Sequence, residues 1–139
     1  MKRVLLVEDE PADVAAIQQA FERVSVNVQL EHAGSARHAW ELMCCWAEAP
    51  SGRRPVCVLI GLKPGAPDAV WLLEQMQADA RFRSLPVMAI GSEPGPIEQA
   101  RQFPNVIGAL KRPGDDLDWR RMIGSVARLS QALPDLAGA

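Results

Sequence analysis

Two neighbouring acids, Glu8 and Asp9, follow directly after the first apolar run of the chain, Val4 to Val7. Paired carboxylates at the end of a buried strand can hold a divalent cation or exchange protons with a substrate. A structural role explains the same residues, because Pro11 suits the first turn of a helix that the acids would cap. No nucleophile and base accompany them in the sequence, so an enzyme built on these two carboxylates is the weakest functional interpretation.

Two cations and two histidines are further candidates for a chemical role. Lys63 and Arg112 are candidates to compensate the charge of the two acids, although a solvated surface position explains both equally well. His32 and His38 are isolated, which argues against a ligand or phosphotransfer role. The three cysteines fit neither a disulfide framework nor a zinc pattern, and the adjacent pair is typical of small hydrophobic residues on a helix.

Apolar runs alternate with amphipathic stretches along the chain, which predicts five strand–helix units. The expected strands are Val4–Val7, Val28–Ala33, Val56–Ile60, Val87–Ile90 and Val106–Leu110. Ser35 and either Asp115 or Asp116 are the expected N-caps of the second and last helices, and prolines at both ends should keep the fourth helix short. This order predicts an α/β fold, a five-stranded parallel sheet of the flavodoxin-like, doubly wound, three-layer kind. In such a fold the working site lies at the carboxyl ends of the central strands.

The composition limits the classes of protein that the chain can be. Its 139 residues suit one domain, expected over residues 1–133 with a frayed tail at 134–139, and 48% hydrophobic residues can bury a core. The net charge is −2 and no run of five like charges occurs, so the basic footprint of a nucleic-acid binder or a membrane tether is missing. No apolar segment suggests a membrane span or a secretory signal, and we expect a cytoplasmic protein.

Three segments resemble the receiver domains of response regulators in two-component signalling. The opening Val4–Asp13 looks most like the single-domain receivers that partner phytochrome-type histidine kinases. Ala78–Val87 and Lys111–Pro113 are similar to later segments of the family and fall in the right order. The resemblance covers roughly residues 2–130.

The resemblance implies a set of groups for phosphoryl transfer. In the family an acid pair holds magnesium, an aspartate ending the third strand accepts the phosphoryl group, and a hydroxyl and a lysine bind its oxygens while an aromatic residue moves with the hydroxyl. Matched residue by residue, the acid pair falls on Glu8 and Asp9, but the acceptor falls on Gly61, the hydroxyl on Gly91 and the aromatic on Ala109. The lysine position falls on Arg112, with Lys111 one residue away.

The loss of the acceptor does not depend on the register of this match. No Asp or Glu occurs from Ala49 to Pro67, so no shift of a few residues puts a carboxylate at the end of the third strand. The chain contains no Thr and no Tyr, and only Ser92 offers a nearby hydroxyl. We therefore expect a degenerate pseudo-receiver without metal or other cofactor. In place of the metal we expect a salt-bridge cluster in which Lys63 or Arg112 reaches the acid pair.

The leading hypothesis is a non-enzymatic signalling adaptor that works by protein–protein contact, independently of phosphorylation, with a histidine kinase or another signalling protein as partner. Self-association through Trp119, Arg120 and Arg121 is also expected, because aromatic and arginine side chains are enriched at interfaces. The alternative is a flavodoxin-like module that binds a small ligand. Its weakness is the acidic segment Glu8–Pro11, which stands where a phosphate would need free amide groups.

Overall fold

The computed structural model describes residues 2–24, 27–49, 54–65 and 67–134, in which strands and helices alternate. The strands are β1 (Lys2–Val7), β2 (Val28–Ala33), β3 (Cys57–Gly61), β4 (Val87–Gly91) and β5 (Val106–Lys111). The helices are α1 (Pro11–Glu22), α2 (Ala36–Glu48), α3 (Asp68–Ala78), α4 (Pro94–Arg101) and α5 (Asp116–Ala132). The predicted tail, apart from Pro134, lies outside the described residues.

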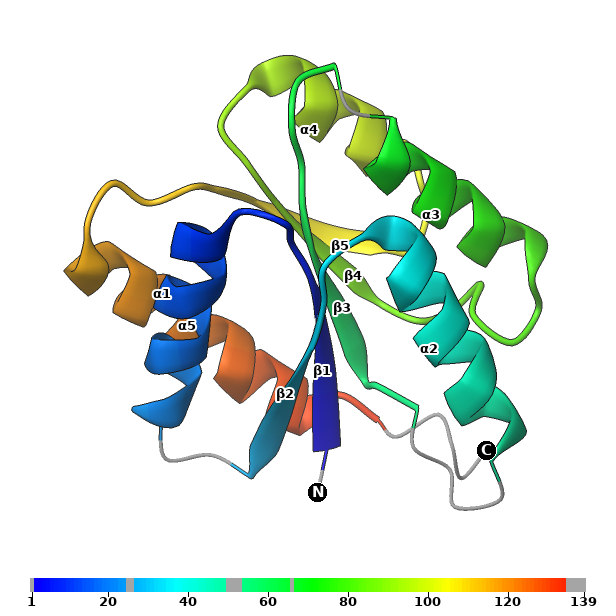
Figure 1. Ribbon diagram of the computed structural model, residues 1–139, viewed down its shortest axis with the longest axis horizontal. Helices are drawn as coiled ribbons and strands as arrows, with labels where there is room; N and C mark the ends of the chain where they lie inside the picture. Colours follow the sequence, from blue (N-terminus) through cyan, green and yellow to red (C-terminus); the bar gives the residue numbers. More distant parts are fainter. Residues whose placement is uncertain (1, 25–26, 50–53, 66, 135–139) are drawn as a thin grey trace.

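The strands form one parallel sheet in the order β2-β1-β3-β4-β5. Helices α1 and α5 cover one face of the sheet, and α2, α3 and α4 cover the other (Figure 1). The predicted flavodoxin-like fold with three layers is therefore confirmed. The strand order places β1, β3 and β4 in the interior of the sheet, so that their carboxyl ends meet at one edge.

The core consists of two apolar layers, one on each face of the sheet. In β3 the side chains alternate between them: Val58 and Ile60 pack against α2 and α3, and Cys57 and Leu59 pack against α1 and α5. Because helices cover both faces, β3 and β4 are apolar along most of their length and nearly every residue is buried. This rigid double layer fixes the positions of the loops that follow β1, β3 and β5.

The helix starts follow local sequence signals. Ser35 Oγ accepts a hydrogen bond from the amide of His38 at 3.1 Å, and Asp115 Oδ1 accepts one from the amide of Asp118 at 2.8 Å, as predicted for N-caps. Helix α4 begins at Pro94 and has only eight residues. Within the described ranges, none of the helices combines the length and apolar character that a membrane crossing requires.

Candidate functional site

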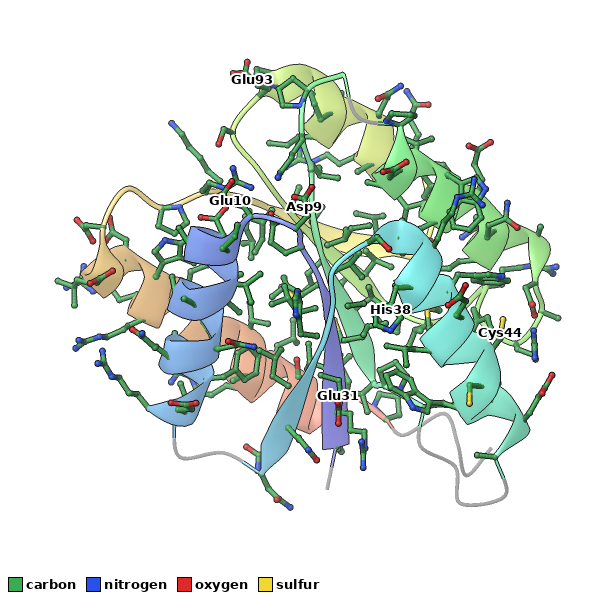
Figure 2. The ribbon with its side chains drawn as sticks, viewed as in Figure 1. Asp9, Glu10, Glu31, His38, Cys44 and Glu93 are labelled. Atoms are coloured by element: carbon green, nitrogen blue, oxygen red, sulfur yellow. The ribbon has the colours of Figure 1, made fainter. Side chains whose placement is uncertain are left out.

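The candidate site lies at the carboxyl edge of the sheet, where charged residues from separate segments meet. Glu8 and Asp9 follow β1, Gly61 is the last residue of β3, and Arg112 follows β5. Figure 2 shows Asp9 and Glu10 together at the end of β1, with Glu93 farther along at the start of α4. The structure therefore brings together the acid pair and the acceptor position, as the order of the strands requires.

Glu8 is the most unusual of these residues because its charged side chain is buried. The side chain is only 3% exposed. Its Oε1 accepts a hydrogen bond from the amide of Glu10 at 3.1 Å, immediately before α1 begins, and its carbonyl oxygen lies 2.8 Å from Nε2 of His32. These contacts with the main chain hold Glu8 in place. Helix α1 itself has no side-chain cap hydrogen bond at its N-cap Glu10, so the capping role considered from the sequence is not seen.

The carboxylate of Glu8 fills the space beside Gly61. An ideal Cβ built on Gly61 would stand 2.8 Å from Cδ of Glu8 and still closer to its Oε2. While Glu8 keeps this conformation, only a residue without a side chain fits beside its carboxylate, and any Cβ at position 61 would require the carboxylate to move. The place beside the end of β3, to which the sequence match assigns the acceptor of receiver domains, is therefore occupied by a carboxylate that reaches across from the end of β1.

Two cations surround the acids. Lys63 forms an ion pair with Asp9 and lies 3.7 Å from Oε1 of Glu8. Nη2 of Arg112 lies 3.8 Å from Oε2 of Glu8, and its Nε lies 3.0 Å from Oδ2 of Asp13. Nε and Nη2 of Arg112 are buried and have no hydrogen-bond acceptor among the described residues, because their N–H groups do not point at the oxygens of Glu8 and Asp13. Arg112 therefore acts through charge at this site and keeps unused donors.

The surroundings of the two acids move their pKa values in opposite directions. Burial raises the pKa of Glu8 above its ordinary value, although the Glu10 amide, Arg112 and Lys63 oppose this effect. The hydrogen bond from Lys63 lowers the pKa of Asp9 and raises that of Lys63 itself. Asp9 and Lys63 thus behave as an ordinary charged pair near the surface, whereas the Glu8 carboxylate is a charge held in the interior.

The other positions of the receiver match are closed by packing. A Cβ on Gly91 would stand 3.2 Å from Ile97 Cγ1 and 3.3 Å from Leu62 Cβ, which is tighter than most real contacts. Ser92, the nearby hydroxyl, is exposed. Ala109 pairs with Ala89 across β4 and β5. No side chain at positions 91 or 109 therefore reaches the acids.

The structure separates Arg112 from its neighbour. The side chain of Lys111 is exposed, whereas Arg112 turns toward the acids and lies near both Glu8 and Asp13. Sequence reasoning missed Asp13. Its signal is its place in the first turn of α1, five residues after Glu8, where a helix that packs on the sheet can direct a side chain toward the loop after β5.

Trp119 does not supply the aromatic contact of the self-association surface expected from the sequence. Trp119 is only 7% exposed and packs in the core layer with Ile123, Val126 and Ala127 of α5. The periodicity of α5 places it on the face toward the sheet, so a large aromatic side chain there serves the core. Arg120 and Arg121 are exposed on the same helix. Large apolar side chains that are exposed elsewhere on β5 and α5 are Ile107, Leu117 and Leu129.

A small pocket opens beside the acids. It has a volume of about 90 Å³ and is lined by residues from β1, β3 and the starts of α2 and α3, including Glu8, Asp9, Gly61, Lys63 and Asp68. This volume is far below the roughly 300 Å³ at which pockets for drug-sized ligands begin. The ammonium of Lys63 beside Asp9 is unfavourable for a divalent cation, and no group of three or more His, Cys, Asp or Glu suited to a metal occurs in the described ranges.

No protein-family model matches the sequence, and no curated protein matches it. Solved structures match in fold. The Mn²⁺-bound form of response regulator Rcp1 has a TM-score of 0.80 at 19% identity, covering 96% of this chain and 99% of that one. RPA3017, a response regulator in red light signaling of R. palustris, gives 0.79 at 19% identity with the same coverage. The phosphorylated cyanobacterial phytochrome response regulator RcpA gives 0.76 at 19%, covering 90% of each chain. At these identities the likeness establishes architecture, and the chain therefore has the fold of response-regulator receiver domains.

Proposed function

We propose that this chain is an atypical receiver of two-component signal transduction that works in the cytoplasm by protein–protein contact and accepts no phosphoryl group. The receiver fold and the order of the family-like segments support a role in signalling. Nothing in the site offers the nucleophile that phosphoryl transfer requires at the end of β3. The proposal is thus a signalling module without enzymatic activity and without a bound metal.

The relationship between Gly61 and Glu8 carries this proposal. A missing acceptor alone would leave an empty place at the end of β3, which a neighbouring acid could still serve. Here that place is filled by a carboxylate that is only 3% exposed, and the pocket beside it has a volume of only about 90 Å³, which leaves little room for a phosphodonor. The burial of Glu8 and its position beside Gly61 together support a site that is not phosphorylated.

The absence of a hydroxyl at position 91 and of an aromatic side chain at position 109 supports a protein that does not switch between two conformations. A receiver switches because the phosphoryl group favours one of two arrangements of its helices and strands. Ile97 and Leu62 crowd the position of Gly91, which has no hydroxyl, and Ala109 stands in place of an aromatic side chain. A bound phosphoryl group would therefore find no hydroxyl to bind and no aromatic side chain to move. We therefore propose that partner binding, and not a modification, controls the protein.

The partner that we propose is a histidine kinase or another signalling protein, and self-association is a further part of the proposal. The face made by α4, β5 and α5 is the candidate surface. β5 is an edge strand of the sheet, and Ile107 on β5 and Leu117 on α5 are each about half exposed. Exposed apolar side chains on β5 and α5, together with the exposed Arg120 and Arg121, have the composition of an interface.

The direct test is exposure to phosphodonors. Acetyl phosphate with magnesium, and separately a histidine kinase with ATP, should leave the intact mass of this protein unchanged while a competent receiver in the same tube is modified. The same kinase should be retained by the immobilised protein equally with and without ATP. A stoichiometric acyl phosphate on any carboxylate, Glu8 included, would refute the proposal.

A further inference from the structure

We infer that Lys63 and Arg112 form an anion-binding site whose permanent occupant is the carboxylate of Glu8. The inference rests on the proposed function in one respect, since it explains what replaces the phosphoryl chemistry at this edge of the sheet. Glu8 is then an internal ligand that joins the end of β1 to the loops after β3 and β5. The class of molecule that the site accepts, once Glu8 is removed, is a small carboxylate.

The geometry assigns one cation to each oxygen of the carboxylate. Oε1 lies 3.7 Å from Nζ of Lys63, and Oε2 lies 3.8 Å from Nη2 of Arg112. Lys63 follows β3 and Arg112 follows β5, so the two cations approach from different segments of the chain. A charged side chain that is only 3% exposed is stable only when opposite charges lie this near.

The Glu8 carboxylate does not satisfy the hydrogen-bonding capacity of the two cations. The distances of 3.7 and 3.8 Å exceed a hydrogen bond, and the Nε and Nη2 donors of Arg112 are buried without an acceptor among the residues that the structure describes. Glu8 is tethered to β1 and to the amide of Glu10, which prevents a closer approach. A free carboxylate has no such tether and can turn toward these donors.

Access to the site is already present. The pocket of about 90 Å³ is bounded by Glu8, Gly61 and Lys63, so a ligand that entered it would meet the space left by the Glu8 side chain. Truncation of Glu8 to alanine removes the Cγ methylene and the carboxylate, and acetate supplies the same atoms. Gly61 adds no side chain to obstruct them.

The test is rescue of Glu8→Ala by acetate, followed as thermal stability. We expect Glu8→Ala to lower Tm, and saturating acetate to raise the Tm of this variant by about 3–5 °C as a ligand specific for the folded state would. Acetamide, which has the shape without the charge, and chloride at equal ionic strength should not do so. Wild type and the neighbouring surface variant Glu10→Ala should respond to acetate no more than to chloride.

The cations are tested by removing them. In Glu8→Ala/Arg112→Gln the acetate effect should be lost, whereas Glu8→Ala/Lys111→Gln, which alters an exposed neighbour, should keep it. An acetate effect equal to that of acetamide or chloride, or one that survives Arg112→Gln, would overturn the inference.

A second measurement covers the case in which Glu8→Ala does not fold. Glu8→Gln keeps the shape of the side chain but removes its charge, and exchange with water of the Arg112 Nη2 protons, on the nitrogen that lies near Glu8, should then accelerate about tenfold. Unchanged exchange would overturn the inference. Neither experiment uses a kinase or a partner, so failure here leaves the proposed function standing, and phosphorylation of the wild type would leave the acetate result standing.

Discussion

In the observed conformation, the carboxylate of Glu8 occupies the space that a Cβ at position 61 would need. With Gly61 in place, Cδ of Glu8 stands 2.8 Å from the ideal Cβ position, and real Cβ atoms essentially never have neighbours closer than 3.0 Å. One carboxylate can therefore occupy this point, either from β1 or from β3. In this chain the carboxylate comes from Glu8 at the end of β1, and the absence of a side chain at Gly61 provides the space in which Glu8 is buried.

The first prediction follows from this exclusion. Gly61→Ala should destabilise the protein by about 1–3 kcal/mol, because the new methyl group must displace a carboxylate held by two cations. Gly108→Ala is the matched control, since it also adds a methyl group to a strand but meets nothing within 4 Å. In a cycle of Glu8→Ala, Gly61→Asp and the double variant, unfolding in urea should show a favourable coupling of about 1–3 kcal/mol. Additive effects of the two substitutions would contradict the exclusion.

The fold was predictable because its signals are local and agree with one another. The apolar runs gave the strands to within two residues at each end, and residues 28–33 and the first residues of β4 and β5 match without change. The prolines that limit α4 and the caps at Ser35 and Asp115 act over a few residues of chain. The role of Trp119 was harder to predict, because an aromatic residue suits both the core and an interface, although its spacing from Ile123 and Val126 places it on the buried face of α5.

The site was predictable in composition but not in arrangement. The absence of Asp and Glu from Ala49 to Pro67 is a property of residue types, and the sequence states it directly. The inward turn of Glu8 depends on the space beside Gly61, and the pairing of Arg112 with Asp13 depends on how α1 sits on the sheet. Such contacts between distant segments have no signal in spacing, so they require the structure.

The second prediction concerns restoration of a switch. Gly61→Asp alone should not produce a receiver that responds to a phosphate mimic. Gly91, crowded by Ile97 and Leu62, offers no hydroxyl to bind the mimic, and Ala109 offers no aromatic side chain that could move with such a hydroxyl. Amide spectra with and without the mimic should differ only near residue 61. Shifts that extend through residues 94–130 would show that the coupling between site and surface survives.

The third prediction concerns magnesium. Wild type should show no saturable binding below about the millimolar range, because Lys63 already pairs with Asp9 and β3 supplies no carboxylate. Lys63→Met should strengthen binding, since it removes the ammonium that competes with the ion. Lys111→Met is the matched control at an exposed position. Tryptophan fluorescence and the amide shifts of Asp9 and Glu10 report the titration, and tight binding to wild type would contradict the expectation.

The fourth prediction concerns self-association. Because Trp119 is buried, Trp119→Ala would damage the core and cannot test an interface. Ile107→Asp and Leu117→Asp should instead weaken association without unfolding the protein, since these side chains are 50% and 53% exposed. Leu129→Asp, at the other end of α5, is the control and should leave association unchanged. Sedimentation at several concentrations decides the question, and a wild type that stays monomeric at high concentration rules the interface out.

The fifth prediction concerns pH, and it depends on the charges around Glu8. Lys63 and Arg112 favour the ionised form, and so does the hydrogen bond from the Glu10 amide. Asp13 repels it, and burial opposes it most strongly. The result is a pKa raised above the ordinary value of 4.5, so the folded protein holds the proton of Glu8 to a higher pH than the unfolded chain does.

The sign of the effect on stability follows from this difference in bound protons. Where the folded state binds more protons than the unfolded state, the free energy of unfolding falls as pH rises. The contribution of Glu8 is therefore greatest below pH 4.5 and decreases as pH rises through its folded pKa. Glu8→Gln removes this titration, so the stability of wild type relative to Glu8→Gln should decline as pH rises above 4.5. Asp9→Asn should show the opposite trend, because the lowered pKa of Asp9 gives stability that is lost as pH falls. Urea unfolding in a chelator at several pH values measures both, and an advantage of wild type over Glu8→Gln that grows with pH would refute the assignment of Glu8 as a buried charge.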